Sequence, residues 1–183
     1  MRLKKILIIL IGVGILSVII FALGRKNEEM QRVEEIIPEQ EISEEQERKT
    51  IIKLYFKDKE TGELREEFRT IDVKLLASNP YEKLIRMLIE GPKSEHLQKI
   101  IPEGTKINSI KIECNTVYVD LSKEFIDNHV EGIENERKTI YSIVNTLTEL
   151  NEVTFVRILI EGQENLEFKD GCMNFKENFE RNN

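Results

Sequence analysis

An apolar run of eighteen residues near the N-terminus, Ile6 to Leu23, constrains this chain more strongly than any other feature of its sequence. The run contains no charged side chain, and Ser17 is its only hydroxyl residue. At the rise of an α-helix it would cover roughly 27 Å, close to the thickness of the hydrocarbon core of a bilayer. We therefore predict one transmembrane helix that anchors the chain in a membrane through residues 6–23.

The charges beside this run predict its orientation. Three basic side chains precede it, whereas only Arg25 and Lys26 follow it before acidic residues begin. Because basic flanks are retained inside, residues 1–24 are expected to form a cytoplasmic N-terminus and a signal-anchor, with the rest of the chain outside the cell membrane. A cleaved signal peptide is the alternative. Its apolar core is normally about 7–15 residues long, and Phe21-Ala22-Leu23-Gly24 matches a cleavage pattern poorly.

Residues 25–50 are expected to form an acidic, flexible linker. They are rich in Glu and Gln, hold one proline and contain no aromatic residue. A segment of this composition cannot bury enough apolar surface to build a core. A short helix could extend the anchor as far as Pro38, but a sustained coiled coil would need about three heptads or more.

The net charge argues against a nucleic-acid partner. The chain carries a formal charge of −7, and its excess of acids lies in the part that we expect outside the membrane. A polyanion would be repelled, and no cluster of Lys and Arg interleaved with aromatic residues offsets this.

Cysteine and histidine are too scarce to predict a metal centre. Cys114 and Cys172 are the two cysteines, and His96 and His129 are the two histidines. Their spacing fits no zinc pattern, so we assign no metal ligand. On the oxidising side of a membrane the two cysteines could form a disulfide, but a domain of this size does not need one, and two unpaired thiols are the simpler interpretation.

Residues 51–170 are predicted to form one α+β domain, with helices packed on a small mixed β-sheet that contains β-hairpins, and residues 171–183 a polar tail. Alternating and continuous apolar patterns bounded by turn residues indicate the strands. Five strands are expected, at residues 51–57, 64–73, 107–112, 117–121 and 153–160. The last is nearly continuous in apolar character, which is typical of a central strand.

Two longer helices are predicted between these strands. The first begins at Asn79-Pro80, a cap followed by a proline at the first helical position, and ends at Gly91-Pro92. The second runs from about Glu134 to Leu150 and places apolar side chains on one face at helical spacing. Those side chains are Ile140, Ile143, Val144, Leu147 and Leu150.

The stretch most similar to an active site is Asp120-Leu121-Ser122-Lys123-Glu124. A structural interpretation accounts for it, with Ser122 as the N-cap of a short helix and the two carboxylates near the N-terminus of that helix. A serine nucleophile needs a base, and His129 is separated from Ser122 by a predicted helix and loop. Asn145 on the second long helix is expected to face solvent. We therefore assign no catalytic, cofactor-binding or metal residue, and we expect a non-enzymatic protein.

The order of several short motifs resembles the GerMN domain family. These motifs are Leu54-Tyr55-Phe56, Glu90-Gly91-Pro92, Ile101 to Thr105, Val117 to Phe125, Tyr141 to Leu147, and Val156 through Gly162. The resemblance covers roughly residues 51–168. It implies an α+β fold akin to the ring-building domains of sporulation complexes, and a role in sporulation or spore germination in the envelope of spore-forming bacteria. It implies no catalytic residue and no cofactor. Another member of this family has two such domains and a lipid-bearing cysteine. This chain differs from it in having one such domain and a predicted transmembrane helix.

Three functions follow as expectations. The first is an extracytoplasmic scaffold or adaptor in sporulation or germination that binds envelope or sporulation-complex proteins, with self-association left open. The second is a peptidoglycan-binding module, for which the chain offers eight Phe and four Tyr but no Trp. The third is a cell-wall hydrolase that uses Asp120 and Glu124 as acid and base. We favour the first.

Overall fold

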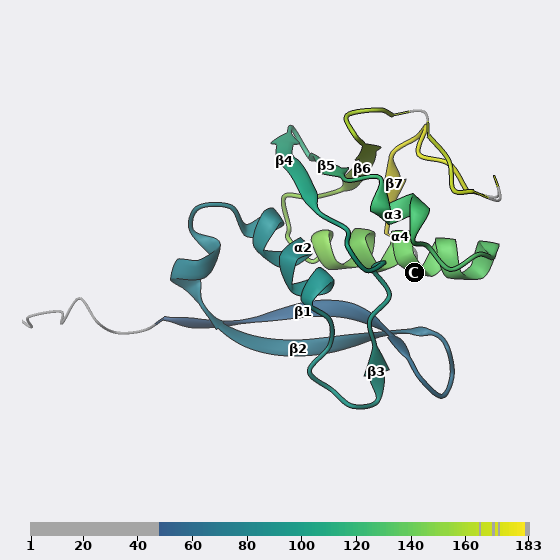
Figure 1. Ribbon diagram of the computed structural model, residues 1–183. Helices are drawn as coiled ribbons and strands as arrows, with labels where there is room; N and C mark the ends of the chain where they lie inside the picture. Colours follow the sequence, from purple (N-terminus) through teal and green to yellow (C-terminus); the bar gives the residue numbers. More distant parts are fainter. Residues whose placement is uncertain (1–47, 165, 170, 172, 182–183) are drawn as a thin grey trace, which may run out of the picture. The chain divides into compact units, whose positions relative to one another are not determined.

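The computed structural model describes residues 48–164, 166–169, 171 and 173–181 (Figure 1). The predicted anchor at residues 6–23 and nearly all of the predicted linker lie outside the described residues. Within the described part of the chain, no helix has the length and apolar character needed to cross a bilayer.

Three antiparallel strands form the first sheet, in the order β2-β1-β3. They are β1 (Lys49–Asp58), β2 (Leu64–Asp72) and β3 (Leu97–Gln98). The hairpin between β1 and β2 was predicted, and its turn is stabilised by Asp58, whose carboxylate accepts the backbone N–H groups of Glu60 and Thr61. Gly62 follows with φ of 73°, a conformation that suits glycine.

Four strands form the second sheet, in the order β4-β5-β6-β7. They are β4 (Ile107–Glu113), β5 (Thr116–Leu121), β6 (Phe155–Ile160) and β7 (Phe179–Glu180). The hairpin of β4 and β5 was predicted, and β6 lies between β5 and β7, as its apolar sequence indicated. Because β5 and β6 are parallel whereas the other pairs are antiparallel, this sheet is mixed.

The α+β class is confirmed, but the expectation of one sheet was wrong. A helix takes the place of a further strand at the edge of β1. The backbone N–H of Tyr55 donates to the hydroxyl of Thr146 at 3.1 Å, and the hydroxyl of Ser142 donates to the carbonyl of Tyr55 at 2.6 Å. Two hydroxyl side chains one helical turn apart therefore satisfy this edge, and the second sheet forms separately.

Three helices begin close to where the sequence predicted: α2 (Pro80–Glu90), α3 (Glu124–Asp127) and α4 (Ile133–Leu147). The short helix η1 (Val73–Leu76) was not predicted. Asn79 caps α2 through a hydrogen bond from the N–H of Glu82 to its side-chain oxygen at 3.0 Å, and Gly91 ends the helix with φ of 100°. The end of α4 comes three residues before the predicted end, where Thr148 donates its hydroxyl to the carbonyl of Val144.

The core lies between the two sheets. Helices α2 and α4 occupy the space between them, so that α4 contacts both β1 and β6 and α2 contacts both β1 and β4 (Figure 1). The predicted inward side chains of α4 from Ile140 to Leu147 are fully buried, and Leu150 is partly buried.

The C-terminal residues contribute to this core. Phe175, which lies in the segment predicted to be a polar tail, is fully buried against Phe168 at 5.1 Å between ring centroids. Phe125 of α3 lies 5.7 Å from Phe168 and completes the cluster. Strand β7 then pairs with β6, which fixes the last described residues to the second sheet.

Candidate functional site

The side chains of the stretch that most resembled an active site each make a structural contact. The Asp120 carboxylate accepts the backbone N–H of Gly162 at 2.9 Å. The Ser122 hydroxyl accepts the backbone N–H of Lys106 at 2.9 Å, which joins it to the start of β4. The prediction that Ser122 caps α3 was wrong, because α3 begins at Glu124 and the cap position belongs to Lys123, which makes no capping bond through its side chain.

The ionisation of Glu124 fits a structural role better than a catalytic one. A hydrogen bond from Ser122 is the main cause that lowers the pKa of the Glu124 carboxyl below its ordinary value. A general acid in a glycosidase needs the opposite, a carboxyl whose pKa is raised so that it holds a proton at neutral pH.

Asn145 is buried, which corrects the expectation that it faces solvent. Its side chain is 9% exposed, and its Oδ1 atom has no hydrogen-bond partner among the described residues. The physical reason is the position of α4 between two sheets, which covers more of the helix than the single apolar face that the sequence indicated. The buried hydroxyls of Ser142 and Thr146 on the same helix have the same origin.

A groove of about 370 Å³ lies between the β3–β4 segment, the α3–α4 loop and the first turns of α4. Ile101 and Pro102 are buried beneath it, and Lys57 reaches it from the end of β1. The Lys57 ammonium donates to the side-chain oxygen of Asn135 at 3.1 Å. The groove therefore combines an apolar floor with cationic and amide groups.

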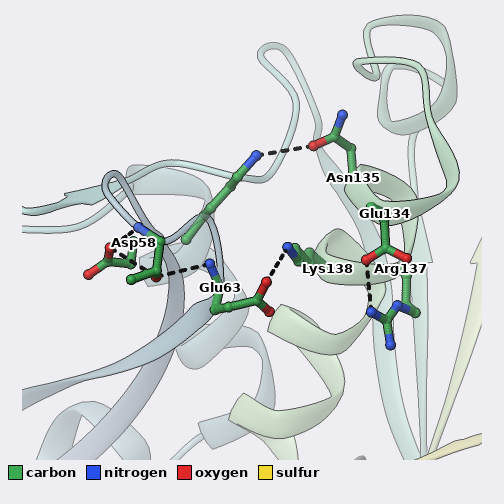
Figure 2. A network of polar contacts seen from close by, with 8 residues as sticks. Asp58, Glu63, Glu134, Asn135, Arg137 and Lys138 are labelled. Carbon is green, nitrogen blue, oxygen red and sulfur yellow. Dashed lines mark hydrogen bonds and ion pairs between the residues drawn. The ribbon is translucent and has the colours of Figure 1, made fainter.

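Figure 2 shows how the start of α4 faces the turn of the β1–β2 hairpin. Asn135 and Lys138 point from the helix toward that turn, where Lys138 pairs with Glu63 at 2.9 Å. Arg137 binds Glu134 on its own helix instead. The Lys138–Glu63 pair and the Lys57–Asn135 bond therefore connect the start of α4 to the β1–β2 hairpin beside the groove.

His129 also lines the groove, where both of its ring nitrogens lie close to oxygen atoms. Its Nδ1 atom is 2.7 Å from the carbonyl of Val130, and its Nε2 atom is 2.8 Å from the hydroxyl of Thr139. Its ring packs 4.5 Å from that of Phe168. His96 is exposed. In the part of the chain that the structure describes, no three His, Cys, Asp or Glu side chains gather in a way that could hold a metal. Cys114 is exposed in the β4–β5 turn, and Cys172 lies outside the described residues.

Strand β2 has polar side chains inside and an aromatic side chain outside, a feature that the sequence analysis missed. Glu67 and Arg69 are 9% and 6% exposed, whereas Phe68 between them is 59% exposed. The Glu67 carboxylate accepts backbone N–H groups from Lys93 and Ser94 at 2.9 and 2.8 Å. Burial opposes the charged form of Glu67, but the hydrogen bonds from Ser94 and Arg69 outweigh it and hold its pKa below the ordinary value.

The outer edge of β2 carries backbone groups that pair with no strand of the described residues. Since the N–H and C=O of Tyr55 point away from β2 toward α4, its register partner Glu66 must direct its own backbone groups away from β1. Phe68 and Thr70 follow at two-residue intervals along β2, so their backbone groups also point away from β1. No described strand pairs with this edge.

Apolar side chains lie beside this open edge. Ile51 on the neighbouring strand is 67% exposed, which is more than Phe68. Both side chains line a cavity of about 140 Å³ together with Leu84 of α2 and Leu150. We call Ile51, Phe68 and the outer edge of β2 the β2 surface.

A cluster of charged and aromatic side chains lies at the C-terminal end of α4. The Glu149 carboxylate pairs with Lys53 at 2.9 Å and with Arg181, and it accepts the Tyr55 hydroxyl at 2.7 Å. Burial opposes its charge, but the hydrogen bonds from these three groups lower the pKa of Glu149 to about 2. Burial, and then Glu149 itself, raises the pKa of Tyr55 to about 12. The cluster ties the last described residues to β1 and α4.

The sequence matches a known protein family over most of the described residues. Residues 53–166 match the Germane family, which is described as "Sporulation and spore germination". No curated protein matches the chain significantly.

Solved structures with the same fold include the tandem GerMN domains of the sporulation protein GerM from Bacillus subtilis. The TM-score is 0.60 at 22% identity, over 73% of this chain and 46% of that one, so this chain spans about half of the tandem. The first GerMN domain alone gives 0.60 at 22% identity, over 72% of this chain and 98% of the domain. A putative lipoprotein from Clostridium perfringens gives 0.50 at 25% identity, over 72% and 87%.

Proposed function

This chain belongs to the Germane family of sporulation and spore germination domains, and from that membership we propose that it is a non-enzymatic scaffold or adaptor of the cell envelope. In this proposal the domain binds a protein partner outside the membrane, and the β2 surface makes the contact. The observation that carries the proposal is the exposure of Phe68 on an open strand edge, between two buried charged residues.

The chemistry of the edge favours a polypeptide partner. An open strand presents N–H and C=O groups at a two-residue spacing, and an extended peptide segment supplies the complementary groups at the same spacing. Phe68 would then contact apolar side chains on the face of the added strand, and Ile51 on β1 would extend the same apolar face. Aromatic side chains, Phe among them, are enriched in protein interfaces relative to the rest of the surface.

The inner side of β2 supports the same proposal. The hydrogen bonds of Glu67 and Arg69 to the segment Gly91–Ser94 fix the strand from below, so its outer edge is held in an extended conformation before any partner arrives. A rigid edge of this kind loses little conformational entropy on binding.

Two observations support the non-enzymatic and envelope parts of the proposal. Asp120 and Glu124 are both engaged in contacts that hold the fold, and the pKa of Glu124 is shifted in the direction opposite to that of a general acid. The envelope location follows from the predicted anchor at residues 6–23, and it agrees with the description of one structural relative as a putative lipoprotein.

Co-purification of the full-length chain from sporulating cells, with proteins identified after crosslinking, tests this proposal. Phe68→Ser should remove the bound envelope protein at unchanged abundance of the chain. Ile133→Ser is a matched control, because Ile133 is 49% exposed at the start of α4 and lines neither the groove nor the cavity beside Phe68. Equal recovery of the partner with Phe68→Ser, or equal loss with both variants, would reject the β2 surface as the contact.

A further inference from the structure

The groove beside the start of α4 contains a lysine with unused hydrogen-bonding capacity. The Lys57 ammonium has three N–H donors, and the bond that it makes goes to the neutral amide oxygen of Asn135. Among the described residues no carboxylate lies within ion-pair distance of Lys57. Lys57 is partly buried, so an anion in the groove would interact with it under weaker solvent screening than at an open surface.

A second lysine in the groove has a partner that a ligand could replace. Lys99 pairs with Glu103 at 2.9 Å, but the Glu103 side chain is 86% exposed. Ion pairs at such exposed positions contribute little to stability. Lys57, Lys99 and Glu103 together leave the groove with one positive charge in excess when His129 is neutral, in a chain whose formal charge is −7.

From these groups we propose that the groove binds a small ligand with one carboxylate and at least one amide, the chemistry of a short peptide's C-terminus. The two ammonium groups bind the carboxylate. The side-chain amides of Gln98 and Asn128 line the groove and can pair with an amide of the ligand, and buried Ile101 forms an apolar floor for a small side chain.

The same features disfavour other ligand classes. A nucleotide or another polyanion would require more positive charge than two lysines supply, and it would be repelled by the acidic chain. A volume of about 370 Å³ falls at the small end of ligand pockets, which suits a peptide of two or three residues.

The groove is formed beforehand by contacts that do not involve a ligand. The Asn128 side chain donates to the backbone carbonyl of Glu103, and the Asn135 side chain donates to that of Glu131. His129 is held between Val130 and Thr139. These bonds fix the side chains around Lys57, so that little ordering is required when a ligand binds.

Titration of the purified full-length chain with N-acetyl-alanyl-alanine, followed by NMR or calorimetry, tests this inference. The L,L and D,D forms are both used, each as the free acid and as the C-terminal amide. The acids should bind saturably, and the amides at least about tenfold more weakly, which corresponds to the loss of one charge-assisted hydrogen bond. A preference for the D,D acid would identify the source as a cell-wall stem peptide, and a preference for the L,L acid as a protein or free peptide.

Four variants locate the site. Lys57→Met should weaken binding of the acid by about tenfold or more, while Lys57→Arg should retain it. Asn135→Asp should also weaken binding, because it gives Lys57 a carboxylate partner and removes the amide that donates to the Glu131 carbonyl. Lys59→Met is the control, since the Lys59 ammonium bonds to the Glu95 carbonyl away from the groove.

Some results would overturn the inference. Equal affinity for acid and amide would exclude the carboxylate as the recognised group, and no saturable binding of either acid would exclude the site. An equal loss of affinity for the acid in Lys57→Met and Lys59→Met would mean that only the overall charge of the chain affects binding, and would exclude the groove as the site. The outcome is independent of the β2 surface, because Phe68→Ser leaves every residue of the groove in place.

Discussion

The carboxylate atom Oε1 of Glu67 lies 2.6 Å from the Nε atom of Arg69, and both side chains are buried beneath β2. Arg69 also donates to the backbone carbonyl of Gly91 at 2.6 Å, and its guanidinium lies 5.5 Å from the ring centroid of Phe56. This pair therefore connects β2 to the Gly91-Pro92 turn, one of the motifs on which the family resemblance rests.

Replacing Glu67 by Ala should lower the free energy of unfolding by about 3–5 kcal/mol, because it leaves the buried Arg69 charge without its partner. Urea denaturation of the purified chain measures this. Glu66→Ala is the matched control, since Glu66 is exposed on the same strand, and its effect should stay within about 0.5 kcal/mol. Equal effects of the two variants would mean that the ion pair does not hold the turn.

Acid should remove the stabilising effect of Glu149. The pKa of this carboxyl falls from 4.5 to about 2 in the folded chain, so its contribution is present above pH 4.5 and is lost as the pH falls toward about 2. The difference in unfolding free energy between the wild type and Glu149→Gln should therefore shrink over that range. A difference that stays constant down to pH about 2 would contradict the ion pairs with Lys53 and Arg181.

Leu147→Ala should cost on the order of 2–5 kcal/mol of stability, since Leu147 is fully buried on α4 between the sheets. Leu75→Ala serves as its control, because Leu75 is 50% exposed in η1 and should change the urea midpoint little. An unchanged midpoint for Leu147→Ala would show that the helix packs differently.

Replacing Asp120 and Glu124 together by Asn and Gln should leave the biological role of the folded chain largely intact. Both carboxylates have structural contacts, whereas the loss of a true acid and base would reduce a rate by about 100-fold or more for each. The assay scores release of fragments from purified peptidoglycan together with spore formation and germination. Fragment release by the wild type that disappears in the folded double variant would establish a hydrolase.

Local patterns predicted most of the secondary structure. The start of α2 at Asn79 and Pro80 and its end at a glycine depend on residues that are close together in the sequence. The same is true of the two hairpins. The burial of Asn145 and the separation into two sheets depend on contacts between segments far apart in the chain. The hydrogen bond from the Ser142 hydroxyl to the Tyr55 carbonyl and the one from the Tyr55 N–H to the Thr146 hydroxyl, which span 87 and 91 positions, illustrate this.

The sequence of β2 contains one signal that could have predicted its unusual outer face. Within Leu64–Asp72 the apolar residues Leu64 and Phe68 fall at even positions, but Ile71 falls at an odd one. A strand with one buried face should keep its apolar residues at one parity, so this conflict indicates that one set faces outward. The charged partners Glu67 and Arg69 share the parity of Ile71, which placed them inside.

The most direct test of the central proposal is photocrosslinking from position 68 of the full-length chain in sporulating cells, with and without Thr70→Pro. The N–H of Thr70 points to the open edge, so proline there removes an edge donor without breaking the ladder with β1. We predict a crosslink from position 68 to one envelope protein that Thr70→Pro abolishes while the melting temperature of the chain changes little. A crosslink that persists in the folded Thr70→Pro chain would contradict strand addition at β2. The absence of a crosslink at position 68, alongside its formation at the control position 133, would contradict it too.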